Sequence, residues 1–331
     1  MARYTQLTPP DVRRICHGYG LEADRLEPID GGMANSSYVV AAGQQRYVLT
    51  VLDNHTFASA KSLSQLLCQL GERDLSPIPL TATVPGSGRS TGTGMGSSMV
   101  TSHRGRPVLL KPYVEGACWD TLSAGLLSRT GAAMAAVHSL PPDSLDVPHQ
   151  GRRLTAEARR RCRDFTDREF ASWLLDEWDR VTSFTEREVK ATLVHGDLFP
   201  DNIVVTADDE VVFLDWETAS LDDPLIDLGM AVVGLCRNED GVFSPEMVRS
   251  LVAGYTGAAP SADVDSAALR DASVYAAIVI AYHRYVRHHI THPSPAKQDL
   301  YREVRPLVEA VRAHWPADLP TGADSRVSAV V

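Results

Sequence analysis

The sequence lacks the marks of several classes of protein. No apolar run approaches the roughly 20 residues that a membrane-spanning helix needs, and the N-terminus has no apolar core followed by a small-residue cleavage site. We therefore expect neither a membrane partner nor a signal peptide. The five cysteines are scattered singly, without a CxxC pair, which is typical of reduced thiols and argues against a disulfide framework or a zinc site. These absences predict a cytoplasmic protein.

Clustered positive charge is also missing. The chain carries 32 Lys and Arg against 42 Asp and Glu, a formal net charge of −10, and it has no basic stripe interleaved with aromatic residues. Because nucleic-acid binding depends on such clusters, we expect no nucleic-acid partner. The 331 residues are sufficient for two packed lobes. We expect the chain to act as a monomer or a homodimer.

Strand and helix patterns divide the chain into two unequal parts. Two β-rich runs, SYVVAA and RYVLTVL, follow a glycine-rich segment and are separated by Gly43, which predicts an antiparallel hairpin. Apolar residues at helical spacing predict helices at residues 57–75 and, as one long charged helix, around residues 155–187. The predicted organisation is an N-terminal lobe at residues 1–113, a linker at about 113–118, a mainly helical lobe at 119–316 and a disordered tail at 317–331.

The stretch from Leu193 to Asp227 carries the residues suited to chemistry. Asp197 and Asn202 lie five residues apart, and Asp215 ends an apolar run thirteen residues later. Two short strands around the segment TADDE predict a hairpin that brings Asn202 beside Asp215. A side-chain amide and a carboxylate at one edge would suit a hard cation such as Mg²⁺.

Phosphoryl transfer requires a carboxylate near the acceptor hydroxyl and metal ions held by oxygen ligands. An Asp–Asn pair alone more often lies in a turn, where the side chains hydrogen-bond the local backbone. The full pattern, HGD-x4-N followed by an apolar strand, an Asp and a second Asp, is comparable to the HRD-x4-N and DFG elements of protein kinases. It therefore favours a phosphoryl-transfer site.

The motifs HGDLFPDN and LDWETASLDDPLIDL resemble the catalytic-loop and metal-binding motifs of the aminoglycoside phosphotransferase and choline kinase superfamily. The LFPDN version is similar to that of the type II homoserine kinases. The resemblance implies an α/β (α+β) chain with a bilobal protein-kinase-like fold, a small antiparallel-sheet N-terminal lobe that binds nucleotide and a larger helical catalytic lobe. It also implies ATP as co-substrate, Mg²⁺ as cofactor, and transfer of the γ-phosphoryl group to a hydroxyl of a small amine-bearing metabolite, homoserine being the first choice.

The resemblance also implies roles for individual residues. Asp197 corresponds to the catalytic base, Asn202 and Asp215 to magnesium ligands, and His195 and Asp227 to residues that brace the catalytic loop. The segment before the first hairpin corresponds to the loop that covers the phosphates, where small side chains let backbone N–H groups approach oxygen atoms. The residues implied to bind the nucleotide are Gly31, Gly32, Asn35, Ser36, Val48, Thr50, Lys111, Tyr113 and Val114.

Two departures from the superfamily pattern keep alternatives open. Thr50 and Gln65 stand where most members carry a phosphate-binding Lys and its Glu partner, so a nucleotide-binding pseudokinase stays an alternative, although type II homoserine kinases also carry Thr in this strand. The sequence DWE is closer to antibiotic kinases and leaves an antibiotic O-phosphotransferase as a second alternative. Candidate acceptor contacts, each also compatible with a solvated surface charge, are Glu217, Asp222 and Asp223 for an ammonium group and Arg284 and Arg287 for a carboxylate.

Overall fold

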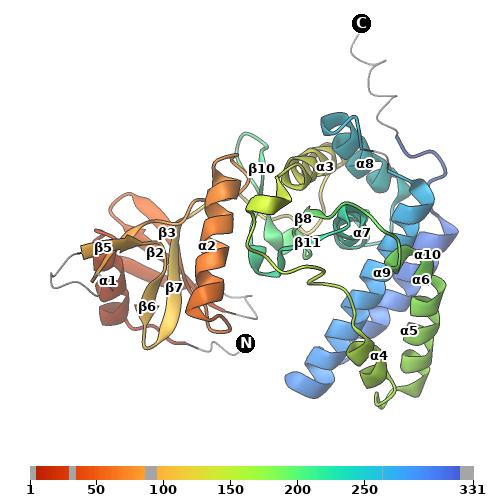
Figure 1. Cartoon of the computed structure of the whole chain (residues 1–331), viewed down its shortest axis with the longest axis horizontal. Helices are drawn as coiled ribbons and strands as arrows, with labels where there is room; N and C mark the ends of the chain where they lie inside the picture. The colour runs from red at the N-terminus through yellow and green to blue at the C-terminus, as the bar shows by residue number, and fades with distance from the viewer. Residues whose placement is uncertain (1–4, 30–34, 86–94, 263, 321–331) are drawn as a thin grey trace, which may run out of the picture. The chain divides into compact units, whose positions relative to one another are not determined.

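The computed structural model describes residues 5–29, 35–85, 95–262 and 264–320. The chain divides into two compact units, Met1–Glu115 and Gly116–Val331. Figure 1 shows a sheet in the first unit and mainly helices in the second. In the described part of the chain, no helix is both long and apolar enough to cross a membrane.

The N-terminal unit is built on a five-stranded antiparallel sheet (Figure 1). Its strand order is β1-β2-β3-β7-β6. Gly43, with a φ of +59°, makes the tight turn between β2 and β3, and the hairpin predicted there is confirmed. The five strands are β1 (Arg25–Pro28), β2 (Ser36–Ala42), β3 (Gln45–Val51), β6 (Thr101–His103) and β7 (Arg106–Pro112).

Helix α1 (Pro9–Gly18) covers one face of this sheet. Its start is specified locally, because Thr8 and Asp11 form a reciprocal capping box and prolines fill the first two helical positions. The apolar face of α1, with Val12 and Ile15, packs into a core that includes Leu49 of β3 and Leu110 of β7. Helix α2 (Phe57–Gly71) contacts β7, and a separate hairpin is formed by β4 (Ala82–Pro85) and β5 (Met95–Ser98).

Helix α2 ends four residues earlier than the sequence pattern predicts. The chain leaves the helix after Gly71, and Asp74 adopts a left-handed φ of +59°. The chain that follows packs closely against the helix end: a Cβ atom at position 71 would lie 2.1 Å from the side chain of Ile78. The apolar Leu75 thus belongs to the following loop and not to the helix.

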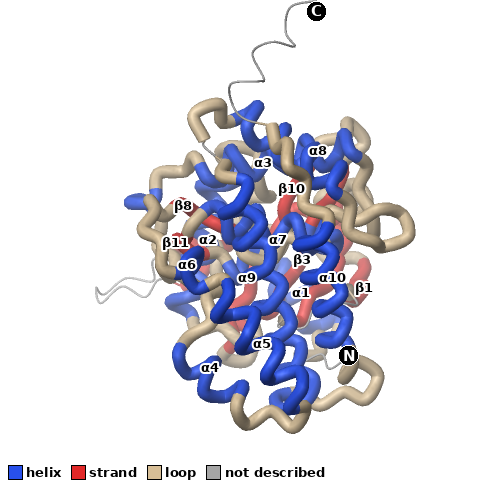
Figure 2. Tube along the Cα trace, turned by 90° about the vertical axis from the view of Figure 1, so that its right-hand side faces the viewer, coloured by secondary structure: helices blue, strands red, loops and turns tan. Residues whose placement is uncertain are grey.

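The second unit is a helical assembly with two small strand pairs. Figures 1 and 2 show α5, α9 and α10 running beside one another. The strand pairs are β8 (Thr192–Val194) with β11 (Ser220–Asp222) and β9 (Ile203–Val205) with β10 (Val211–Phe213). The longer helices are α3 (Ala124–His138), α5 (Arg168–Arg180), α7 (Pro224–Leu235), α8 (Pro245–Ala258), α9 (Ser266–Tyr285) and α10 (Val304–Ala313).

The single long helix predicted around residues 155–187 is wrong. The chain forms α4 (Ala156–Cys162), α5 and the short α6 (Thr182–Thr185) instead. Phe165 in the break is buried and stacks on Tyr285 of α9 with ring centroids 4.0 Å apart. Asp167 then caps α5 by accepting a hydrogen bond from the backbone of Phe170. A tertiary aromatic contact and a new N-cap therefore override the helical periodicity.

Candidate functional site

The predicted hairpin after the catalytic-loop motif is confirmed. Strand β9 (Ile203–Val205) pairs antiparallel with β10 (Val211–Phe213), with Ile203 opposite Phe213. The backbone nitrogen of Leu214 donates to the carbonyl of Asn202 at 2.9 Å. Asn202 therefore precedes one strand and Asp215 follows the other at the same end of the hairpin.

Asp215 itself adopts a left-handed backbone conformation. Its φ and ψ are 58° and 64°, and its side chain is exposed. Such a conformation in a non-glycine residue costs about 1–2 kcal/mol and persists only where its surroundings hold it. The next residue supplies that support: Trp216 is buried and its indole Nε1 donates to the carbonyl of Phe213 at 3.1 Å. The turn thus leaves the Asp215 carboxylate exposed at the end of β10.

Asp227 braces the loop that carries Asp197. It lies in the first turn of α7, is buried, and accepts hydrogen bonds from the backbone nitrogens of His195 at 2.8 Å and Gly196 at 2.7 Å. The imidazole of His138 contacts the same carboxylate at 3.1 Å. Although burial opposes the charged form, the contacts from His138 and the loop backbone hold the pKa of Asp227 below its usual value.

His195 connects this loop to the end of β10. Its Nε2 lies 2.7 Å from the carbonyl oxygen of Leu214, and its Nδ1 lies 3.3 Å from the backbone nitrogen of Asp197. A carbonyl can only accept and a backbone N–H can only donate, so the ring carries its proton on Nε2. Desolvation lowers the pKa of the fully buried ring, which is therefore neutral. One neutral imidazole thus couples the position of Asp197 to that of the Asp215 turn.

Asp197 is partly open to solvent and has a charged partner. Its side chain is 32% exposed, and Oδ1 accepts an ion-paired hydrogen bond of 2.7 Å from Arg152. Desolvation raises the pKa of Asp197, against the opposing effect of Arg152. Asn202 donates from Nδ2 to the backbone carbonyl of Asp197 at 2.8 Å. Asp197, Asn202 and the Asp215 turn are therefore linked by direct contacts and by His195.

Arg152 is not among the residues that the sequence pattern predicts. It lies in an irregular segment 45 residues before Asp197, and nothing in its local pattern distinguishes it from the many other arginines of this stretch. Gly196 makes room for it: the φ of Gly196 is +79°, and a Cβ atom there would lie 2.8 Å from Cγ of Arg152. The need for glycine in HGD thus has a tertiary cause.

Two acidic residues predicted at the acceptor site are buried and paired. Asp222 is 2% exposed and accepts hydrogen bonds from two nitrogens of Arg153, at 2.7 and 2.9 Å. Asp223 is 1% exposed, caps α7 through the backbone of Leu225 at 2.9 Å, and lies 3.6 Å from Arg187. These carboxylates anchor β11 (Ser220–Asp222) and α7. Glu217 lies in a short 3₁₀ turn, Trp216–Thr218, and is partly buried.

The arginines predicted to bind a carboxylate lie at the end of α9. Arg284 donates to the carbonyl of Leu300 at 2.9 Å and pairs with Glu303 at 3.4 Å, and burial lowers its pKa. Arg287 lies in the π-helical turn Val286–Thr291 and is partly buried. The structure thus uses Arg284 to fix the segment before α10.

Four of the nine predicted nucleotide-binding residues lie in strands of the N-terminal sheet: Ser36, Val48, Thr50 and Lys111. Val48 is paired in register with Lys111, and Thr50 with Leu109, so Val48, Thr50 and Lys111 project from the same face. Val48 and Lys111 are only partly buried, unlike the residues that face α1. Thr50 is buried and its hydroxyl lies 3.2 Å from that of Ser37.

The other predicted nucleotide contacts are distributed around this sheet. Ser36 is buried and donates to Asp53 at 2.6 Å, next to the buried Asn35. The guanidinium of Arg46 lies 4.1 Å from the ring centre of Tyr113, and Val114 follows as a partly buried residue. Gly31 and Gly32 lie outside the described residues. Gln65, where a Glu partner was considered, is exposed on α2.

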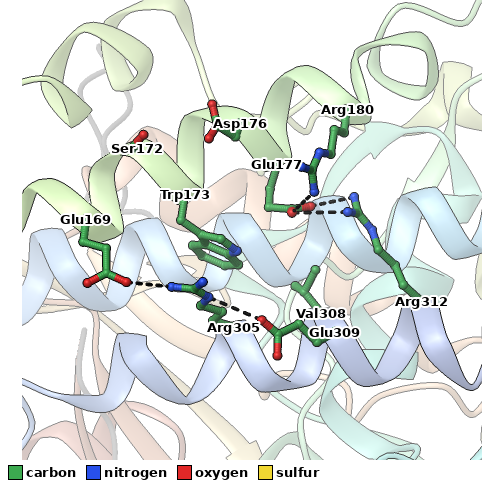
Figure 3. A pocket seen from close by; sticks show the side chains of 10 residues that line it. All are labelled: Glu169, Ser172, Trp173, Asp176, Glu177, Arg180, Arg305, Val308, Glu309 and Arg312. Atoms are coloured by element: carbon green, nitrogen blue, oxygen red, sulfur yellow. Dashed lines mark hydrogen bonds and ion pairs between the residues drawn. The ribbon is translucent and has the colours of Figure 1, made fainter.

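A groove between α5 and α10 is separate from these residues (Figure 3). Its volume is about 410 Å³, and its lining is mainly charged. Arg305 contacts Glu169 and Glu309, while Arg180 and Arg312 both contact Glu177. Because the three arginines of the groove are paired with its glutamates, it does not define a ligand. Among the described residues, no group of three or more His, Cys, Asp or Glu side chains could hold a metal ion.

Comparison with known proteins agrees with this geometry. A model of the phosphotransferase enzyme family matches residues 25–262. A homoserine kinase from Methylobacillus glycogenes is 26% identical over 273 residues, covering 81% of this chain and 82% of the relative. A homoserine kinase from Neisseria meningitidis serogroup B is 25% identical over 264 residues, covering 78% and 83%.

Solved structures show the same fold at lower identity. A spectinomycin phosphotransferase in complex with ADP and spectinomycin superposes with a TM-score of 0.69 at 14% identity, covering 93% of this chain and 99% of that one. A choline kinase from Streptococcus pneumoniae gives 0.62 at 12% identity, covering 92% and 99%. The predicted fold, a small antiparallel sheet with a mainly helical second part as in these kinases, is confirmed.

Proposed function

The chain belongs to the phosphotransferase enzyme family, and we propose that it transfers the γ-phosphoryl group of ATP to the hydroxyl of an amine-bearing metabolite, homoserine first. Family membership makes it an ATP-dependent phosphotransferase with an alcohol as acceptor. The observation that carries the proposed chemistry is the linkage of Asp197, Asn202 and the Asp215 turn through His195. Homoserine as the acceptor comes from the relatives that span about four-fifths of the chain.

In the proposed reaction, Asp197 is the catalytic base. The acceptor oxygen forms a bond to the γ-phosphorus while the bond from that phosphorus to the oxygen of ADP breaks. The hydroxyl proton passes to the Asp197 carboxylate, and ADP leaves with the bonding electrons. The protein contributes mainly by positioning. The hydrogen bonds that the backbone N–H groups of His195 and Gly196 donate to Asp227 support this role.

The donor set at the end of the β9–β10 hairpin fits Mg²⁺. Asn202 already donates its Nδ2 to a backbone carbonyl, so its amide oxygen is the atom oriented to serve as a ligand. Asp215 adds an exposed carboxylate. A site with few protein oxygen ligands suits Mg²⁺, because this ion keeps several waters and binds phosphate oxygens as well. Bound there, the ion would neutralise charge on the phosphates.

For the nucleotide, we propose the face of the N-terminal sheet that carries Val48, Thr50 and Lys111, opposite the face that packs against α1. Val48 and Lys111 form a partly buried row across β3 and β7, with Thr50 in the next row. Tyr113 and Val114 follow β7 and would offer backbone groups to the adenine edge. The remaining proposed contacts are Asn35, Ser36 and, outside the described residues, Gly31 and Gly32.

The buried acidic residues favour a small zwitterionic acceptor over a polycationic antibiotic. An antibiotic with several ammonium groups needs open carboxylates, but Asp222 and Asp223 are buried and already paired with arginines. Glu217 stays our candidate for the single ammonium group of an amino acid.

A screen for acceptor-dependent ADP release tests the function. Homoserine, serine, threonine, choline, ethanolamine and an aminoglycoside are each supplied with Mg-ATP, and Asp197→Asn is the control. We expect the highest kcat/KM with homoserine and a loss of about 10²–10⁴-fold in kcat for Asp197→Asn. If the enzyme turned over only the antibiotic, homoserine would be refuted as the acceptor. Nucleotide binding without turnover of any acceptor would instead support a pseudokinase.

A further inference from the structure

Arg152 is a charged side chain beside the proposed base, and its contacts do not give it a structural role. Its NH2 nitrogen lies 2.7 Å from Oδ1 of Asp197, and among the described residues this is its one ion pair. The neighbouring Arg153 differs, because it makes three hydrogen bonds to Asp222 and one to the carbonyl of Thr185. Arg153 thus fixes the segment locally, whereas Arg152 reaches Asp197.

The guanidinium of Arg152 has donors to spare. It carries five N–H groups in a planar fork, a shape that matches a carboxylate in two parallel hydrogen bonds. The Nε nitrogen is buried and has no hydrogen-bond partner in the described part of the chain. A buried donor without an acceptor is uncommon in folded proteins and points to a missing partner. The side chain as a whole is 19% exposed, so a small ligand can approach it.

In the described part of the chain, Asp197 is the one acidic side chain that forms an ion pair with Arg152. His283 lies in the last turn of α9. Desolvation, with a further contribution from Arg152, lowers the pKa of His283 to about 4, so the imidazole is neutral at physiological pH. Gly196 packs against the stem of Arg152, which keeps the guanidinium beside Asp197. The site thus pairs one cation with one anion, and the guanidinium keeps an unsatisfied donor for a second anion.

We propose that Arg152 recognises the carboxylate of an amino-acid acceptor and turns from Asp197 to that group when the acceptor binds. The inference deepens the proposed function and rests on it. In a four-carbon amino acid with a terminal hydroxyl, the hydroxyl oxygen and the carboxylate are roughly 5 Å apart in an extended chain. With its hydroxyl on Asp197, such an acceptor brings its carboxylate within reach of the same guanidinium.

Because of this exchange, Asp197 is free to act as the base only when the acceptor carries a carboxylate. An acceptor that carries the carboxylate supplies Arg152 with a new partner and releases Asp197 to take the hydroxyl proton. An amino alcohol without a carboxylate leaves the ion pair between Arg152 and Asp197 in place and presents its ammonium group to a guanidinium of the same sign. Arg152 is thus a residue that determines specificity for amino acids over amino alcohols and polycations.

Two acceptors that differ only in the carboxylate test the proposal: homoserine and 3-amino-1-propanol. Both are assayed with wild type, Arg152→Gln and Arg152→Lys, and with Arg163→Gln as a control at an exposed arginine. Because a charge-assisted pair is involved, we expect Arg152→Gln to raise KM for homoserine about 10–100-fold. It should leave kcat/KM for 3-amino-1-propanol unchanged or higher. Arg152→Lys should fall between, and Arg163→Gln should match wild type.

The outcomes separate this inference from the proposed function. A wild-type enzyme without activity on homoserine overturns the proposed function, and the inference with it. A wild type active on homoserine whose Arg152→Gln variant loses the same factor with both acceptors, or keeps its KM for homoserine, overturns the inference alone. If the variants do not fold, calorimetric titration of wild type with the two acceptors decides: homoserine must bind at least about 10-fold more tightly.

Discussion

The backbone nitrogen of Gly196, the residue directly before Asp197, donates to the carboxylate of Asp227 at 2.7 Å. Asp227 lies on a different element, in the first turn of α7. The contact therefore transmits the position of a buried helix to the loop that carries the proposed base. The charge of Asp227 and its position in α7 lead to two measurable consequences.

Replacing Asp227 by Asn removes the charge that binds two backbone N–H groups and His138. We expect a loss of about 2–4 kcal/mol in the free energy of unfolding, because the partners stay buried without their anion. Urea denaturation followed by circular dichroism measures it. Asp240→Asn, at an exposed carboxylate, is the matched control and should lie within about 0.5 kcal/mol of wild type. Equal stability of the two variants would contradict the bracing role.

The difference in unfolding free energy between wild type and Asp227→Asn should depend on pH. The pKa of Asp227 is lower in the folded protein than its usual value, so its stabilisation is complete above the unfolded-state pKa of about 3.9. As pH falls below that value, the unfolded state takes up the proton first, and the advantage of wild type over Asp227→Asn must shrink. Unfolding free energies measured from pH 7 down to about pH 3 test this. A difference that grows on acidification would be inconsistent with the lowered pKa.

Arg152 predicts a shift in the pH profile of the reaction. Burial raises the pKa of Asp197 and Arg152 opposes that rise, so removing the guanidinium moves the pKa further upward. Asp197 must be deprotonated to accept the hydroxyl proton. The acid limb of kcat/KM, which reports the free enzyme, should therefore move to higher pH in Arg152→Gln. The profile of Arg163→Gln should coincide with that of wild type. An unmoved acid limb would mean that Asp197 is not the group that titrates.

Two substitutions at Asp215 can separate the effect of its charge from the effect of its backbone conformation. Asn tolerates the left-handed φ of 58° at this position better than Ala does. Asp215→Asn should therefore keep wild-type stability while lowering kcat with Mg-ATP by roughly 10²-fold or more, because the metal loses a charged ligand. Asp215→Ala should show the same kinetic loss and about 1 kcal/mol less stability. Full activity of Asp215→Asn, or activity that survives removal of divalent ions with EDTA, would refute the proposed metal role.

Two glycines of α8 distinguish close helix packing from open surface. A Cβ atom at Gly254 would lie 1.8 Å from the backbone oxygen of Ser128 in α3, whereas one at Gly257 would meet nothing within 4 Å. Gly254→Ala should therefore destabilise the protein by several kcal/mol or prevent folding, since overpacking against backbone is not easily relieved. Gly257→Ala should gain up to about 1 kcal/mol from helix propensity. Thermal denaturation of both variants measures the contrast, and equal melting temperatures would refute it.

Local sequence determined those parts of the protein whose partners are close in the chain. The β9–β10 hairpin was predictable because two short apolar strands flank a polar turn, and Asn202 and Asp215 then meet at its end by antiparallel pairing alone. The catalytic-loop motif also pointed to Asp197 without any knowledge of the fold, because spacing within one loop carries that information.

Only the tertiary structure decided which distant side chains complete the site. Arg152 reaches Asp197 across 45 residues, while Asp222 and Asp223, next to the metal motif in sequence, are buried against arginines. Likewise, Phe165 interrupts the helical pattern because it stacks on Tyr285 of α9. Hydrogen bonds within a turn depend on neighbouring residues. The pairing of a buried charge depends instead on which element packs against it, and that is a property of the whole fold.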